Sequence, residues 1–192
     1  MRRYLTSRLT QNYAVFKDIY GRGGKPFTPE PQAAPETLFR IDSRPPEELS
    51  ENMMQGRAAF ERQVSGPLLP IEETRAKTLQ DYQKTNSPKH FISFSKSLAS
   101  AMEFARKTKA DGATLGKDFH LYKVTFTGRN DEETTKGFDL NSALGMFSAH
   151  KNQDEFAVWD RLGPHKLEDI SADSKADMDS GAWEDMHDKG WK

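Results

Sequence analysis

Residues 38–46 read LFRIDSRPP, a stretch in which apolar and polar side chains alternate until two prolines follow. The alternation predicts a β-strand with Phe39 and Ile41 on one face and Arg40 and Asp42 on the other. The prolines end the strand, because neither has an N–H group to donate to a neighbouring strand. Two interpretations fit this pattern: an edge strand with a solvated polar face, or a polar face that lines a cleft for an anionic ligand.

The rest of the chain mixes strand patterns with helix patterns. Alternating segments predict further strands at 90–95, 119–128 and 155–159. Helical spacing and first-turn acids predict a helical turn at 46–53, helices at 71–85 and 98–109, and a short helix at 139–147. Ser97 or Ser100 is expected to cap the helix at 98–109, and Asn141 the helix at 139–147.

This order of elements favours an α+β fold, because strands and helices do not alternate in the regular rhythm of a doubly wound sheet. The Gly- and Pro-rich stretch before the first strand predicts that residues 1–36 are an irregular, partly flexible lead-in. Within it, residues 11–20 could form a short helix or strand. Residues 37–172 are expected to form the domain, and residues 173–192 an acidic polar tail. Trp183 and Trp191 are expected to anchor that tail to the domain, with docking of a partner as the alternative.

The composition sets limits on the class of protein. A chain of 192 residues with 35% hydrophobic and 30% charged residues suits one domain with a modest core. No apolar run is long enough to span a bilayer, and the basic start lacks the continuous apolar stretch of a signal peptide, so Sec export is not expected. The absence of cysteine excludes disulfides, thiolate metal ligands and a cysteine nucleophile.

Several common catalytic signatures are missing from the sequence. The GRGG at 21–24 has neither the preceding strand nor the following helix of a phosphate-binding loop. No Gly-x-Ser-x-Gly elbow of a serine hydrolase is present. The histidines show no metal-ligand spacing, so no metal site is expected; they are His90, His120, His150, His165 and His187.

Three polar positions on separate strands remain: Arg40, Ser93 and the Gln153-Asp154-Glu155 triplet that leads into the last strand. Each position alone has an ordinary explanation, as a solvated arginine, an alternating serine or an acidic turn.

The wording and order of the segments around these positions resemble the arginine–serine–glutamate signature of the cholera- and pertussis-type mono-ADP-ribosyltransferases. LFRIDSRPPEEL resembles the family's first strand and the prolines after it, and HFISFSKSLASA resembles its aromatic-x-Ser-Thr-Ser strand, with Phe94 in place of the threonine. DLNSALGMFSAHKNQDEFAVWDRLGPHKLEDI resembles the stretch that contains the catalytic glutamate. The resemblance covers about residues 38–170. It implies an ADP-ribosyltransferase-like α+β fold, a mixed split β-sandwich with peripheral helices.

The resemblance also implies the chemistry and the site. Such enzymes break the nicotinamide–ribose bond of NAD and transfer ADP-ribose to an acceptor, without a metal. Glu155 would bind the ribose 2′-OH and stabilise the oxocarbenium-like transition state, while Ser93 holds Glu155 by a hydrogen bond. Arg40 would bind the pyrophosphate or ribose region of NAD, oriented by Asp42. Ser95, the last residue of the second motif, is also expected to contact NAD.

Gln153, two residues before the glutamate, bears on the acceptor. Family members that modify arginine carry a second glutamate at that position. An amide can orient an acceptor but cannot deprotonate it, so arginine is disfavoured as the acceptor. The Gln-x-Glu form resembles the branches that modify asparagine or cysteine side chains, and also the branch that modifies guanine in nucleic acid.

The leading hypothesis is therefore a toxin or effector, secreted without a Sec signal or carried by a polymorphic toxin, that acts on a protein in the cytosol of a target cell. An immunity protein or a secretion chaperone would be further partners, and no membrane partner is expected. The alternatives are a guanine ADP-ribosyltransferase, an NAD glycohydrolase and a non-catalytic relative that only binds. One feature departs from the family: only His90 lies between the first and second motifs, so the role of the family's histidine there is vacant or taken by another residue.

Overall fold

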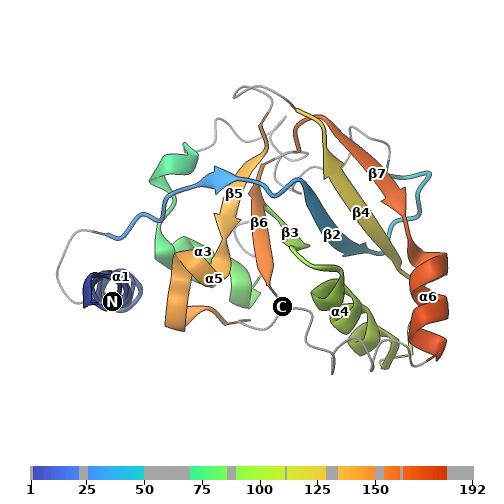
Figure 1. Ribbon diagram of the computed structural model, residues 1–192, viewed down its shortest axis with the longest axis horizontal. Coiled ribbons are helices and arrows are strands. Elements are labelled where there is room, and N and C mark those ends of the chain that lie inside the picture. The colour runs from blue at the N-terminus through green and yellow to red at the C-terminus, as the bar shows by residue number, and fades with distance from the viewer. Residues whose placement is uncertain are drawn as a thin grey trace. The chain divides into compact units, whose positions relative to one another are not determined.

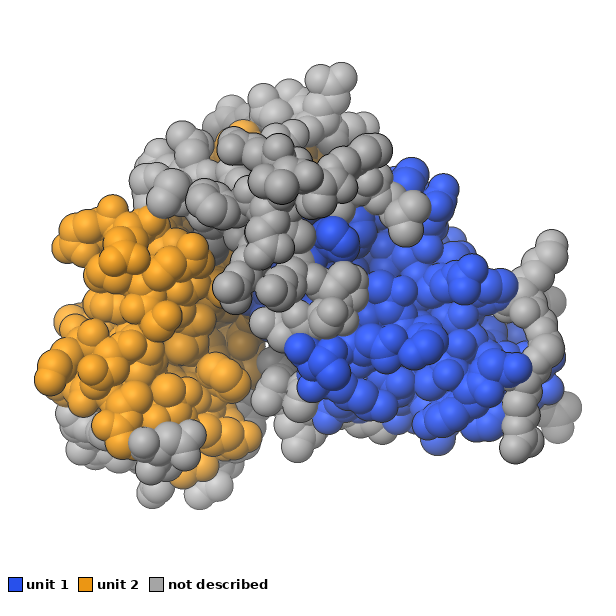
Figure 2. Space-filling model, turned by 180° about the vertical axis from the view of Figure 1, so that it is seen from behind, with its two compact units in different colours: residues 1–34, 55–93, 135–161 blue, residues 35–54, 94–134, 162–192 orange. Residues whose placement is uncertain are grey.

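The computed structural model describes residues 2–21, 26–49, 70–85, 90–110, 112–128, 134–149, 154–160 and 162–180. The chain divides into two compact units (Figure 2). Unit 1 comprises residues 1–34, 55–93 and 135–161, and unit 2 comprises residues 35–54, 94–134 and 162–192. Both units combine helices with antiparallel strands, so the predicted α+β class is confirmed.

Unit 1 contains strands that are neighbours in a sheet, in the order β1-β5-β6-β3 (Figure 1). Residues of β5 pair antiparallel with both β1 and β6, and Phe138 lies opposite Ala157. The strands are β1 (Gln32–Ala33), β5 (Lys136–Asp139), β6 (Glu155–Trp159) and the first part of β3 (Phe91–Ser95). The helices are α1 (Arg2–Tyr20), α3 (Ala76–Thr85) and α5 (Leu140–Leu144), with 3₁₀ turns η1 (Ile71–Glu73) and η2 (Gly145–Phe147).

The core of unit 1 lies where these helices meet the strands. Helix α3 turns Leu79 and Tyr82 inward, and the Tyr82 ring packs on Phe91 with centroids 4.9 Å apart. Aromatic pairs at this distance contribute beyond the area that they bury. The other fully or nearly buried members of the cluster are Val15, Ile71, Ala76, Phe138, Leu140, Ala143, Leu144 and Ala157.

Unit 2 carries the order β3-β2-β4-β7. Strand β4 (His120–Phe126) pairs antiparallel with β2 (Thr37–Asp42) and with β7 (His165–Asp169), and Phe39 of β2 lies opposite Ser95 of β3. Helix α4 (Leu98–Ala110) packs on β2, and α6 (Ser171–Ser180) packs on β4 (Figure 1).

The two faces of β2 have the composition that its alternation predicts. Phe39 and Ile41 pack against a buried cluster built around α4. Leu38, Arg40 and Asp42 lie on the opposite face by the strand's twofold periodicity, and Leu38 is fully buried. The members of the cluster beneath α4 are Ala101, Met102, Ala105, Leu115, Phe119 and Leu121.

The structure shows which residues cap the N-termini of helices α4 and α5. Ser97 caps α4, because its Oγ accepts the Ser100 N–H at 3.2 Å. The expectation for α5 was wrong: Asp139, rather than Asn141, is the cap, since its carboxylate accepts the N–H groups of Asn141 and Ser142. A carboxylate at this position also interacts favourably with the positive end of the helix dipole. Part of the helical turn predicted at 46–53 is present as a turn over residues 46–48, while residues 50–53 lie outside the described residues.

Within the stretch 1–36, where a short helix or strand was expected at 11–20, the structure has the longer helix α1 at Arg2–Tyr20 and the short strand β1. Helix α1 forms because Val15 can be buried against the unit 1 core, which local composition does not reveal. The acidic tail begins with helix α6, while Trp183 and Trp191 lie outside the described residues. The division of the chain at 37 and 172 into lead-in, domain and tail stays a prediction. Within the described part of the chain, every helix is too short or too polar to cross a bilayer.

Candidate active site

Unit 1 holds a buried carboxylate at the first residue of β6. Glu155 is 7% exposed, and its two carboxylate oxygens accept hydrogen bonds from two different elements. The Ser93 hydroxyl of β3 donates to Oε1 at 2.6 Å, and the Gln83 amide of α3 donates to Oε2 at 3.3 Å. The hydrogen bond between Ser93 and Glu155 that the family resemblance implies is therefore present.

Burial of a carboxylate is costly unless hydrogen bonds replace its water. Both donors to Glu155 are neutral, so they stabilise the charge without cancelling it. A carboxylate has about four acceptor positions, which leaves each oxygen able to accept one further hydrogen bond. This arrangement suits a group that must present negative charge to a hydroxyl or to a developing cation.

The backbone before β6 has an uncommon conformation. Asp154 adopts a φ of 48°, in the left-handed region that side chains other than glycine seldom occupy. Aspartate tolerates this region better than most residues, because its short polar side chain can bond locally. The bend at Asp154 immediately precedes Glu155 and so sets where β6 begins.

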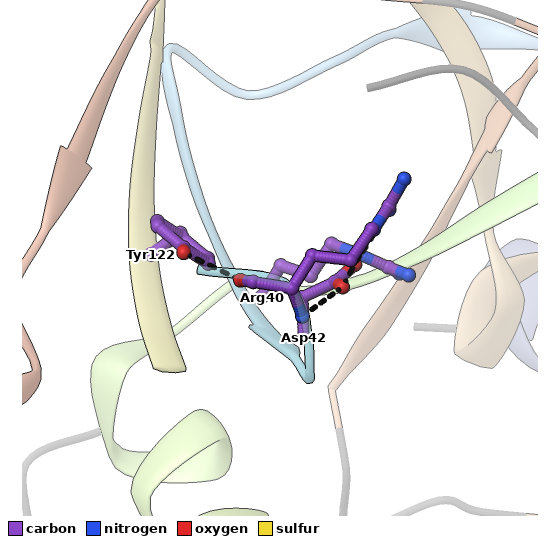
Figure 3. A network of polar contacts seen from close by, with 4 residues as sticks. Arg40, Asp42 and Tyr122 are labelled. Atoms are coloured by element: carbon purple, nitrogen blue, oxygen red, sulfur yellow. Dashed lines mark hydrogen bonds and ion pairs between the residues drawn. The ribbon is translucent and has the colours of Figure 1, made fainter. Parts of the chain in front are cut away.

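Unit 2 holds a second polar cluster, at the end of β2 (Figure 3). The Arg40 Nε donates to Oδ2 of Asp42 at 3.0 Å. Arg44 binds both oxygens of the same carboxylate, Nε to Oδ1 at 2.9 Å and one terminal nitrogen to Oδ2 at 2.8 Å. The two guanidinium groups therefore share one carboxylate, and both are held by charge-assisted hydrogen bonds.

The charge state of Asp42 follows from these contacts. Burial alone would raise its pKa, but the hydrogen bonds from Arg44 and the charge of Arg40 hold the pKa far below the usual range. The same pairing raises the pKa of Arg44. Asp42 therefore remains ionised at every pH at which the protein is expected to work, and it fixes both arginines.

Other contacts orient this cluster. The Arg40 guanidinium lies over the Phe94 ring, 5.8 Å from the centroid, a cation–π distance. The Tyr122 hydroxyl donates to the backbone carbonyl of Arg44 at 2.7 Å (Figure 3). Burial and the nearby carboxylates of Asp169 and Asp42 raise the pKa of Tyr122, so its phenol stays a donor.

Beside Tyr122, His120 contacts Asp169 of β7 at 2.9 Å and stacks on the tyrosine ring. Asp169 also accepts hydrogen bonds from the backbone N–H and the hydroxyl of Ser171. Burial would raise the pKa of Asp169, but the donors from Ser171 and His120 lower it. This network joins the start of α6 to β4 and β7.

The structure places the residues expected at the site as follows. Ser93 and Glu155 are hydrogen-bonded in unit 1, and Arg40 and Asp42 are paired in unit 2. Ser95 is half-buried in unit 2, opposite Phe39 of β2. Gln153 lies outside the described residues. The roles of all these residues in binding NAD stay predictions.

Two residues at these sites were not singled out from the sequence. Arg44 is part of the first motif but had no assigned role. Gln83 was overlooked, although its spacing carried a signal: Ala76, Leu79, Gln80 and Gln83 form one buried stripe of α3. A glutamine on the apolar stripe of a helix must find a hydrogen-bond partner in the core. Among the described residues, no group of three or more acidic or histidine side chains could hold a metal ion.

No protein-family model matches the chain, and no curated protein matches it. Several solved structures are similar to the chain. A variant of heat-labile enterotoxin is 22% identical with a TM-score of 0.42, over 66% of this chain and 61% of that chain. A second variant, from E. coli, is 20% identical with a TM-score of 0.44, over 66% and 63%. A guanine-specific ADP-ribosyltransferase is 17% identical with a TM-score of 0.41, over 76% and 78%. The chain thus spans about three fifths of the length of the enterotoxin chains.

Proposed function

We propose that the protein is an NAD-dependent mono-ADP-ribosyltransferase that modifies a protein side chain other than arginine. The observation that carries the proposal is the buried Glu155 carboxylate, held by the Ser93 hydroxyl at 2.6 Å. It is supported by the arginine–carboxylate cluster around Asp42 and by the sequence resemblance.

In the proposed reaction, the bond between the nicotinamide nitrogen and ribose C1′ breaks, and both bonding electrons leave with neutral nicotinamide. Positive charge develops on C1′ and the ring oxygen, and a nucleophilic atom of the acceptor attacks C1′ and loses its proton. Glu155 accepts a hydrogen bond from the ribose 2′-OH, which strengthens as the cation develops. Ser93 keeps the carboxylate in place during this step.

Arg40 is proposed to bind the pyrophosphate or ribose region of NAD. Its Nε is used by Asp42 at 3.0 Å, so the rest of the guanidinium edge is oriented by an ionised partner. Because Asp42 and Phe94 fix the side chain, little conformational entropy is lost when an anion binds. NAD is consumed as a substrate, and the proposed chemistry uses no metal.

The test is incubation of the protein with labelled NAD and a lysate of candidate target cells. We expect label on protein, and release of nicotinamide that Glu155→Gln lowers at least about a thousandfold, since it removes the charge that stabilises the transition state. Label on nucleic acid would instead support guanine transfer, and release without label would support an NAD glycohydrolase. Failure of the wild-type protein to cleave NAD under any of these conditions would refute the proposal.

Gln153 is proposed to orient the acceptor. Gln153→Ala is therefore expected to spare NAD hydrolysis and to impair transfer. Equal loss of both activities would contradict a role limited to the acceptor. Action in the cytosol of a target cell, and an immunity protein or secretion chaperone as partner, are likewise proposals that the identity of the labelled protein would help to test.

A further inference from the structure

Gln83 stands at the centre of a buried network that joins α3 to the catalytic candidate. The side chain is 8% exposed on the inner face of α3. Its Nε2 donates to Oε2 of Glu155 at 3.3 Å and lies 3.2 Å from the hydroxyl oxygen of Ser148. Its Oε1 accepts the backbone N–H of Ala149 at 2.9 Å.

These contacts allow only one orientation of the Gln83 amide. If the amide were flipped, its oxygen would face the Glu155 carboxylate, and its NH₂ would face the N–H of Ala149. Both pairings are repulsive, and both would leave buried groups without hydrogen bonds. The amide donor is therefore fixed toward Glu155 by a backbone group that side-chain motion cannot remove.

The network continues beyond the amide. The Ser148 hydroxyl donates to Oδ1 of Asn141 in α5 at 3.2 Å, so its oxygen can accept from Gln83. Residues 148 and 149 begin the segment that leads to β6 and that contains Gln153 in the sequence. A single glutamine thus ties the carboxylate to the start of the segment expected to meet the acceptor.

We propose that Gln83 is a positioning residue for Glu155, which orients the carboxylate without neutralising it. The proposal rests on the proposed function in so far as Glu155 is the catalytic carboxylate. A cationic donor at this place would cancel part of the charge that an oxocarbenium-like transition state needs, whereas an amide donor leaves that charge available.

The titratable groups that the structure describes on the neighbouring elements of unit 1 are the same in every variant compared below. They lie on β5, on α3 and next to β3 and β6, and they are Lys136, Asp139, Lys77, Asp81, Lys84, His90, Asp154 and Asp160. Asp139 caps α5, and Asp81 pairs with Lys77 at 2.8 Å. A comparison of single substitutions at position 83 therefore isolates the contribution of Gln83.

The first experiment does not depend on NAD chemistry. The ¹³C chemical shift of the Glu155 carboxyl carbon is measured at neutral pH in the wild-type protein and in Gln83→Met, which keeps the length of the side chain and removes the donor. We expect this chemical shift to differ between the two proteins, because the carboxylate loses a hydrogen bond in the variant. An unchanged chemical shift of Glu155 would overturn the proposal even if the protein cleaves NAD.

Gln80→Met is the matched control. Gln80 lies one turn earlier on the same face of α3, is 5% exposed, and donates to the backbone carbonyl of Phe147 at 3.3 Å. The two substitutions remove the same chemical group from the same buried face. If both change the chemical shift of the Glu155 carboxyl carbon equally, the effect is general loosening of α3 and the proposal fails.

The second experiment is kinetic. In Gln83→Met we expect kcat for NAD cleavage to fall about tenfold, while KM for NAD changes by less than about twofold. This pattern is expected because the variant loses the orientation of Glu155 but keeps the binding of NAD. In Gln83→Glu, activity should be low at neutral pH and rise as the pH falls, because only the neutral acid can donate to Glu155 and accept from Ala149. Parallel pH profiles for the wild-type protein and Gln83→Glu would overturn the proposal. A wild-type protein without NAD cleavage would refute the proposed function and leave the NMR test standing.

Discussion

At the scale of single residues, two buried carboxylates are stabilised in opposite ways. Asp42 is paired with Arg40 and Arg44, which hold its pKa far below the usual range. Glu155 accepts from the neutral groups of Ser93 and Gln83. The first carboxylate is therefore held by charged donors and the second by neutral donors.

Asp42→Asn tests the structural role of the first carboxylate. We expect the free energy of unfolding at pH 7 to fall by roughly 2 kcal/mol, because charge-assisted hydrogen bonds to two arginines are weakened. The pKa of Asp42 is lower in the folded than in the unfolded protein, so the ionised side chain stabilises the fold fully above the unfolded value of about 3.9. That contribution is lost as the pH falls through the folded pKa.

The difference in stability between the wild-type protein and Asp42→Asn should therefore be constant between about pH 5 and 7 and should shrink below about pH 4. Urea denaturation of both proteins at a series of pH values measures it. A difference that grows as the pH falls would contradict the assigned pKa direction.

At the scale of elements, the pairing of β5 with β6 depends on a glycine. A Cβ added at Gly137 would lie 2.3 Å from the backbone oxygen of Ala157 and 2.6 Å from the Phe156 ring. The backbone oxygen cannot swing away as a side chain can, so the strands must separate. Glu155 is the residue before Phe156, and it would move with β6.

Gly137→Ala is therefore expected to lower both stability, by roughly 2 kcal/mol, and NAD cleavage. Thermal unfolding and the activity assay measure the two effects. Lys136→Ala, an exposed change on the same strand, is the control and should alter neither by much. Wild-type stability and activity in Gly137→Ala would mean that β5 and β6 do not approach as described.

At the scale of the whole molecule, the N-terminal helix α1 belongs to the core of unit 1. Val15 is fully buried in that core. The Gln11 amide donates to the backbone carbonyl of Ser142 in α5, and the Asp18 carboxylate accepts the backbone N–H of Lys77 in α3. Helix α1 thus holds the two helices that supply Gln83 and Asn141 to the network around Glu155.

Val15→Ala should lower the free energy of unfolding by about 2 kcal/mol, since it removes buried methyl groups and leaves a cavity. Leu9→Ala, on the same helix but 69% exposed, should change it by less than about 0.5 kcal/mol. Chemical denaturation compares the two variants. Equal effects would show that α1 does not pack as described.

The strands β2, β3, β4 and β6 could be predicted nearly residue by residue, because each is a short run of aromatic, aliphatic and β-branched residues, alternating with polar ones in β2 and β4. Strands β5 and β7 could not, since KGFD and HKLED carry little pattern of their own and become strands by pairing with β6 and β4. The full length of helix α1 was missed for a similar reason: its long exposed and half-exposed surface hides the few positions that pack.

The sequence by itself determined the α+β class, the main strands and the polar residues worth considering, because these depend on side-chain type at close spacing. Only the tertiary structure decided which of those residues meet: that Ser93 and Gln83, ten positions apart in the chain, donate to opposite oxygens of Glu155. It also decided that Asp42 serves two arginines. A buried hydrogen bond joins groups that are distant in sequence, and its partners are selected by packing and by the cost of an unpaired polar group, neither of which local pattern records.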